Sequence, residues 1–222
     1  MKTLTKYLNE KLVVNKDYNY SYTFVPKSLE ELKKIINDIY DKLGPGTKQN
    51  PIDFNDIDVS NIDSFYDDNN YVGIFRNTKF KYIDISYWDV SNVKYMIGVF
   101  SDCEQLKSVG DLSNWDVSNV KNMAAMFSGC YRLKSVGDLS NWNVSNTEHI
   151  SFMFGSCAQL TSVGDLSNWN VSNIKDMRRM FYGCEKLKSV GDLSNWNVSK
   201  VEDMDCTFKD SGITNIPDWY KG

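Results

Sequence analysis

The sequence predicts an α/β repeat solenoid, a right-handed stack of 27-residue coils with a cap at its N-terminal end. The first observation behind this prediction is that the octapeptide SVGDLSNW recurs unchanged at 108–115, 135–142, 162–169 and 189–196. The second is that two aromatic columns keep the same spacing: Trp88, Trp115, Trp142, Trp169 and Trp196, and Phe100, Phe127, Phe154, Phe181 and Phe208. A unit of this size cannot bury its apolar residues alone, so neighbouring units must stack around a continuous core.

Each unit carries two kinds of periodicity. In SNVKNMAAMFSGCYRL the apolar residues lie three or four positions apart, which favours a short helical turn that begins at Ser118 and ends at Gly129. The following LKSVGDLSNW favours a short strand with Leu133, Val136 and Leu139 pointing inward. Parallel strands of successive coils, about 4.8 Å apart, predict a right-handed stack.

Residues 1–50 do not follow the repeat, and we expect them to form an α/β cap. Two strand-like runs, KLVV and YSYTFV, precede a predicted helix over 28–43, where Ser28 and Glu31 form a capping box. The apolar face of this helix should cover the exposed end of the first coil.

The rest of the chain divides into three parts. Residues 51–82 are an atypical first repeat with a four-residue insertion around YDDNNY, and 83–209 contain the regular repeats. Residues 210–222 are a C-terminal capping half-repeat, in which Pro217 removes a backbone donor from the last strand.

The charge balance excludes some classes of partner. There are 25 Lys and Arg against 29 Asp and Glu, for a net charge of −4, so the basic excess of a nucleic-acid-binding protein is absent. No apolar run is long enough for a membrane span, and none near the N-terminus fits a secretory signal. We therefore expect no membrane insertion, and a cytoplasmic or virion component rather than a cell-surface protein.

Units of the form DLSNWDVSNVxxMxxMFxGCxxLxSV resemble the BspA-like leucine-rich-repeat surface proteins, a family with mycoplasma-lipoprotein-type repeats. The resemblance covers about residues 52–219, and the helix followed by NDIDVSNI is similar to the entry module of such proteins from gut bacteria or their phages. The resemblance implies a leucine-rich-repeat-like stack that binds proteins, often in adhesion.

Several repeated columns invite a chemical interpretation. Cys103, Cys130, Cys157 and Cys184 are expected to be buried, reduced thiols, with Cys206 exposed. The aspartates that follow each repeat glycine, such as Asp138, should accept backbone N–H bonds in a turn, although a calcium-binding row stays open. The column of Asn114, Asn141, Asn168 and Asn195 should bond backbone along the stack.

No pattern in the sequence points to an enzyme. There is no Ser/His/Asp set, phosphate-binding loop or Cys/His cluster, so we expect no catalytic residues, no metal and no cofactor. The tryptophan column would be a sugar-stacking platform if it faced outward, but a large apolar residue in every coil favours the core.

Columns that differ from coil to coil mark the candidate binding residues. The partner-binding candidates are Phe152, Arg178, Arg179, Tyr182 and Tyr131, with Lys134 and Lys188 in a mildly basic stripe on a second surface. Column position predicts that Arg179, rather than Arg178, shares the direction of Phe152. The predicted function is a non-enzymatic recognition solenoid that binds a partner protein through one long face, as a phage virion or host-interaction component. The alternative is a carbohydrate-binding adhesin that uses exposed aromatic columns.

Overall fold

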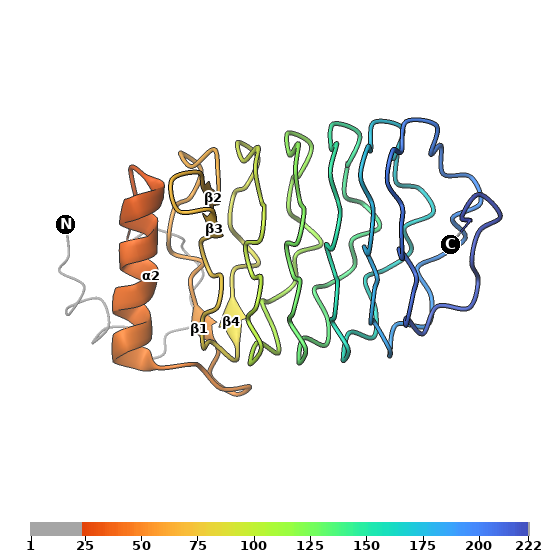
Figure 1. The fold of residues 1–222 in the computed structure, drawn as a ribbon. Coiled ribbons are helices and arrows are strands. Elements are labelled where there is room, and N and C mark those ends of the chain that lie inside the picture. Colours follow the sequence, from red (N-terminus) through yellow and green to blue (C-terminus); the bar gives the residue numbers. More distant parts are fainter. Residues whose placement is uncertain (1–23, 222) are drawn as a thin grey trace.

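The computed structural model describes residues 24–221, in which coils lie side by side in a row with one helix against the first of them (Figure 1). The named elements are α2 (Leu29–Leu43), β1 (Ile52–Asp53), β2 (Tyr66–Asp67), β3 (Val72–Gly73) and β4 (Ile83–Asp84). β1 pairs with β4 in parallel, with Ile52 opposite Ile83. Phe24 bridges Ile57, whereas the predicted KLVV strand lies outside the described residues.

The predicted cap helix is present as α2. The Ser28 hydroxyl accepts from the Glu31 N–H at 3.2 Å, and the Glu31 carboxylate accepts from the Lys27 N–H at 2.9 Å. Gly44 ends the helix with a φ of 70°. Leu32 and Ile36 are fully buried in the common core, so α2 shields the apolar end of the stack.

The predicted insertion forms a hairpin that ties this helix to the first coil. β2 and β3 pair antiparallel across it, and Tyr71 turns the chain with a φ of 56°. The buried Asp67 carboxylate accepts from Asn70 at 2.8 Å and from the Lys33 ammonium of α2 at 2.7 Å. Both hydrogen bonds lower the pKa of Asp67, and the bond from Asn70 lowers it more than the bond from Lys33 does.

The regular coils are joined by a parallel backbone ladder in the half of the unit for which we predicted a helical turn. The N–H groups of Met123, Ala125, Phe127 and Gly129 donate to the carbonyls of His149, Ser151, Met153 and Gly155, at 2.7–2.9 Å. The helical turn is therefore wrong: Ala125 and Gly129 have φ values of 55° and 74°, which no right-handed helix accepts. The apolar spacing of three arises instead from successive turns, such as Ser128 N–H to Ala125 carbonyl.

The predicted strand is reduced to isolated contacts. In the SVGDLSNW half, Ser135 bridges Ser162, and the Leu139 N–H donates to the Val163 carbonyl at 2.9 Å. Leu133 and Val136 point inward as predicted and are fully buried. Both halves of each coil therefore contribute to the parallel pairing, but the longer ladder lies where we did not expect it.

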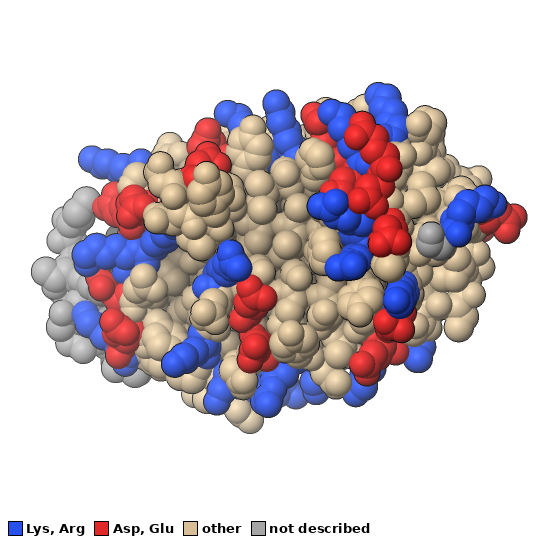
Figure 2. Space-filling view, viewed as in Figure 1, with Lys and Arg blue, Asp and Glu red and all other residues tan. Residues whose placement is uncertain are grey.

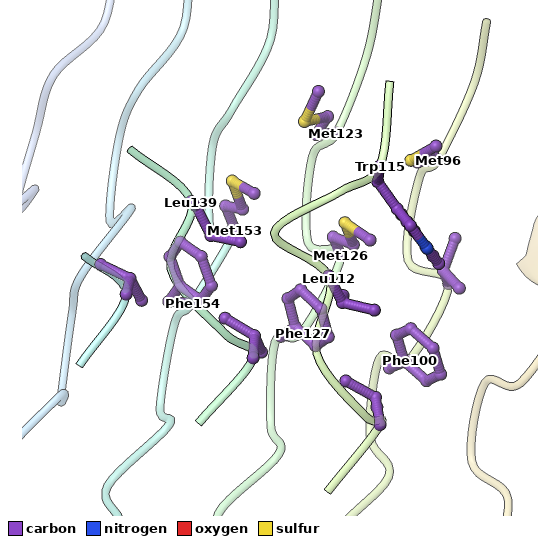
Figure 3. Close-up of a cluster of buried hydrophobic side chains, with 14 of the residues drawn as sticks. Met96, Phe100, Leu112, Trp115, Met123, Met126, Phe127, Leu139, Met153 and Phe154 are labelled. Atoms are coloured by element: carbon purple, nitrogen blue, oxygen red, sulfur yellow. The ribbon is translucent and has the colours of Figure 1, made fainter. Parts of the chain in front are cut away.

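Two columns of stacked rings fill the core, with the phenylalanines lying one behind the other (Figure 3). Phe100 and Phe127 have ring centroids 5.2 Å apart, and the Trp115 and Trp142 rings lie 6.4 Å apart and parallel. The Trp142 Nε1–H donates to the Leu112 carbonyl at 2.9 Å, which satisfies its polar atom inside the core. Because the tryptophans are buried, the prediction that they hold the coils together is confirmed, and a tryptophan sugar platform is wrong.

The cysteine and aspartate columns have structural roles. The four column thiols are buried and free, and each donates to a phenylalanine carbonyl of the preceding coil, as Cys157 does to Phe127 at 3.1 Å. Burial raises the pKa of Cys184 to about 12, so the thiol stays protonated. Asp138 accepts from the Ser140 N–H at 3.0 Å, the turn contact that we predicted. Cys206 is half-buried rather than exposed.

Candidate binding surfaces

One column of the ladder holds residues in the left-handed backbone region in five successive coils. Its members are Gly98, Ala125, Phe152, Arg179 and Cys206, with φ values of 52–58°. The ladder imposes this conformation, since the Phe152 N–H donates to the Arg178 carbonyl at 2.9 Å and the Arg179 N–H to the Asp205 carbonyl at 2.9 Å. Glycine adopts such a φ without strain, whereas a side chain there costs about 1–2 kcal/mol. Phe152 and Arg179 therefore place large side chains where glycine would be the least strained residue.

Phe152 and Arg179 form a cluster with Tyr182. The Arg179 guanidinium carbon lies 5.4 Å from the centroid of the Phe152 ring and 5.8 Å from that of Tyr182. These are cation–π distances, so the two rings hold the guanidinium in place. The prediction that Arg179 shares the direction of Phe152 is confirmed. We call these three residues the Arg179 cluster.

The neighbouring Arg178 is already paired. Its guanidinium lies 3.1 Å from the Asp203 carboxylate and 3.6 Å from that of Asp176. The pKa of Asp203 is lowered, first by the Asp205 N–H and then by Arg178. Within residues 24–221 no ion pair at contact distance engages Arg179, although its charge also helps to lower the pKa of Asp203.

The other sequence-predicted candidates lie on the surface but do not join the cluster. Tyr131 is 48% exposed, and Lys134 and Lys188 are exposed as well. The Lys188 ammonium donates to the Glu185 carbonyl at 3.4 Å. In the described part of the chain, no hydrogen bond or ion pair links any of these three side chains to the Arg179 cluster.

A polar groove on the stack was not predicted. It has a volume of about 500 Å³ and is lined by Asn119, Lys121, Asn146, Glu148, Asn173, Lys175 and Lys200. We call it the asparagine groove. The Asn146 Nδ2 donates to the Ser118 carbonyl of the preceding coil at 2.8 Å, and Asn119 and Asn173 repeat this contact. The asparagine ladder thus runs through this column rather than through Asn141 and its equivalents. The regular spacing of the asparagines in this column was a signal in the sequence, but the Asn141 column has the same spacing and the signal could not separate the two.

Charge is mixed over the surface. Lys and Arg alternate with Asp and Glu over the face in Figure 2, with uncharged areas between them.

Residues 24–221 contain no group of three His, Cys, Asp or Glu side chains placed to hold a metal ion. Nor does any helix of that range have the length and apolar character needed to cross a membrane. Recognition at particular clusters is therefore a better guide to function than an overall field.

Comparison with known proteins identifies the family to which the repeat is similar. The family model described as Mycoplasma protein of unknown function, DUF285, matches residues 47–162 and 111–219, which confirms the resemblance to a mycoplasma-type repeat. A leucine-rich repeat protein from Eubacterium ventriosum, solved by crystallography, is similar with 20% identity and a TM-score of 0.44 over 67% of this chain. The chain spans only 35% of that protein. No curated protein shows significant similarity.

Proposed function

Since the chain belongs to the DUF285 family, whose description assigns no activity, we propose from its geometry that it is a non-enzymatic recognition solenoid. In this proposal it binds an acidic segment of a partner protein through the face that carries the Arg179 cluster. The single observation that supports the proposal most is the guanidinium of Arg179, which lies against two rings and forms no ion pair at contact distance with any residue of 24–221.

The cluster has the properties of an interface anchor. Aromatic residues and arginine are the types that contribute most to binding at protein interfaces. Contact with Phe152 and Tyr182 restricts the Arg179 side chain before binding, which reduces the entropy lost when a partner docks. The edge of a guanidinium held in this way is suited to a bidentate contact with a carboxylate.

The sugar-binding alternative depended on aromatic columns at the surface. Both regular ring columns are buried. Among the exposed tyrosines of the described residues, Tyr71 lies in the insertion hairpin, and Tyr87, Tyr95 and Tyr131 do not share a column. Protein recognition through the Arg179 cluster therefore has the stronger support of the two functions.

The test compares two variants of the cluster with a matched control. Proteins captured from host lysate by the wild-type chain would be identified, and the affinity of each purified candidate measured by calorimetry. Arg179→Glu should weaken the binding of a true partner by about 2 kcal/mol or more, the usual threshold of a hot spot. Lys79→Glu, which makes the same charge reversal on an exposed residue outside both the cluster and the basic stripe, should leave binding unchanged.

Stability measurements keep the result interpretable. The Arg179 side chain is exposed, so the melting temperature of Arg179→Glu should stay near that of the wild type. Full binding by the double variant Arg179→Glu, Phe152→Ala would exclude this face. The basic stripe around Lys134 and Lys188 would then be the next surface to change.

A further inference from the structure

We propose that the asparagine groove is a second binding site, and that it takes a chain of sugars bearing carboxylate groups, such as a uronic-acid oligosaccharide. The groove is distinct from the Arg179 cluster and shares no residue with it. Its volume of about 500 Å³ lies in the range of small-molecule sites.

The amides of the groove are held in a fixed orientation. Because each Nδ2 donates to the coil before it, at 2.8 Å for both Asn119 and Asn146, each amide keeps its Oδ1 as the acceptor. Lys200 shows that a donor in the groove reaches such an oxygen, since its ammonium lies 2.8 Å from the Asn173 Oδ1. The Oδ1 atoms of Asn119 and Asn146 accept no hydrogen bond within residues 24–221, so each can take one from a ligand hydroxyl.

The charges of the groove favour an anion. Lys175 is paired with Glu148 at 2.6 Å, which lowers the pKa of Glu148 and raises that of Lys175, and Glu202 also lies near Lys175. Lys121 forms no ion pair with any described residue, although its charge helps to lower the pKa of Glu148, and Lys200 contacts an amide rather than a carboxylate. Two cations in different coils can therefore contact a ligand that carries more than one negative charge.

The lining of the groove favours a sugar chain over an acidic peptide. Every lining residue is Asn, Lys or Glu, so the apolar contact that the groove offers to peptide side chains is limited to the methylene stems of its lysine and glutamate side chains. A ligand with both hydroxyl donors and carboxylate acceptors matches amide oxygens and ammonium groups together. Successive coils are about 4.8 Å apart, which is close to the length of one sugar residue in a chain, so successive asparagines meet successive sugars.

The experiment titrates the full chain with tetragalacturonic acid by calorimetry. Maltotetraose serves as the neutral sugar control, and a tetraglutamate peptide as the charged control without hydroxyl groups. The double variant Lys121→Gln, Lys200→Gln removes the two unpaired cations, and Lys134→Gln, Lys188→Gln removes the same charge from the basic stripe. Melting temperatures would confirm that both double variants fold.

We expect tetragalacturonic acid to bind the wild-type chain and to lose at least tenfold in affinity in the groove variant. Affinity should stay within twofold in the stripe variant and in Arg179→Glu, and it should fall as salt is raised. The proposal would be overturned by equal binding of the groove variant, by equal or tighter binding of maltotetraose or tetraglutamate, or by no heat of binding at millimolar tetragalacturonic acid.

Discussion

The glycine of each SVGDLSNW unit is the residue for which the structure makes the sharpest stability prediction. Gly164 has a φ of 86°, and a Cβ built there would overlap the Asp138 Oδ1 of the preceding coil and lie 3.1 Å from the Leu139 nitrogen. The same Oδ1 accepts from the Ser140 N–H at 3.0 Å. Gly164→Ala therefore strains the backbone and displaces a carboxylate that holds a turn.

The magnitude can be worked from these two effects. The positive φ costs an alanine about 1–2 kcal/mol, and disturbing the Asp138 hydrogen bond adds about 0.5–1.5 kcal/mol. We therefore expect Gly164→Ala to lower the free energy of unfolding by about 2–3 kcal/mol. Gly98 provides a control, because its φ is 58° and a Cβ there meets only the Ser101 Cβ, at 3.5 Å, an ordinary contact distance. Gly98→Ala should show the first effect alone.

Urea unfolding followed by circular dichroism would measure both variants, together with Asp138→Ala and the double variant Gly164→Ala, Asp138→Ala. Removing the carboxylate relieves the overlap, so the double variant should be more stable than the sum of the single effects predicts, by about 0.5 kcal/mol or more. The reasoning fails if Gly164→Ala costs no more than Gly98→Ala, or if the two single effects simply add.

Three further sets of substitutions test the core, the asparagine ladder and the cap. Phe154→Ala and Trp142→Ala should each cost about 3–5 kcal/mol, as for buried aromatics, and unchanged urea midpoints would contradict the ring columns. Asn146→Ala should cost about 1 kcal/mol through its lost hydrogen bond to the Ser118 carbonyl, whereas Asn141→Ala, at an exposed position without this contact, should have little effect in the same assay. The lowered pKa of Asp67 means that its stabilisation is present above the ordinary Asp pKa of 3.8 and is lost as the pH falls below it. Asp67→Asn should therefore weaken the dependence of stability on pH between 2 and 6. If the variant loses stability at low pH as steeply as the wild type, Asp67 does not have this stabilising role.

The fold could be predicted from the sequence wherever a column of residues was apolar and regular. The Trp142 and Phe154 columns, the cap helix and the place of the insertion follow from residues that repeat or break the repeat, whereas the hairpin within the insertion was not predicted. The helical turn did not follow, because a spacing of three is shared by helices and by successive turns, and a run this short cannot nucleate a helix alone. Hydrogen bonds to the neighbouring coils, such as Ala125 N–H to the Ser151 carbonyl, then determine the backbone.

The two candidate sites differ in how far the sequence could predict them. The Arg179 cluster was predictable, since aligning the copies places Arg179 directly after Phe152 in one column. The asparagine groove was not, because it depends on which of two asparagine columns faces the preceding coil. That choice is made by the turn at Ser118, whose carbonyl is placed to accept from Asn146. A column alignment contains the residues of this contact but not the orientation of the carbonyl.

The left-handed column leads to a last prediction, on the conflict between stability and binding. At most strand positions glycine is less stable than alanine by about 0.5–1 kcal/mol, but Arg179 has a φ of 52°, which reverses this order. Both Arg179→Gly and Arg179→Ala lose the cation–π contacts with Phe152 and Tyr182, and only the alanine keeps the backbone strain. We expect Arg179→Gly to be more stable than Arg179→Ala by about 1 kcal/mol in urea unfolding, while both lose partner binding to a similar extent. An alanine variant as stable as the glycine variant would show that the ladder does not strain this position. The large side chains there would then need no functional explanation.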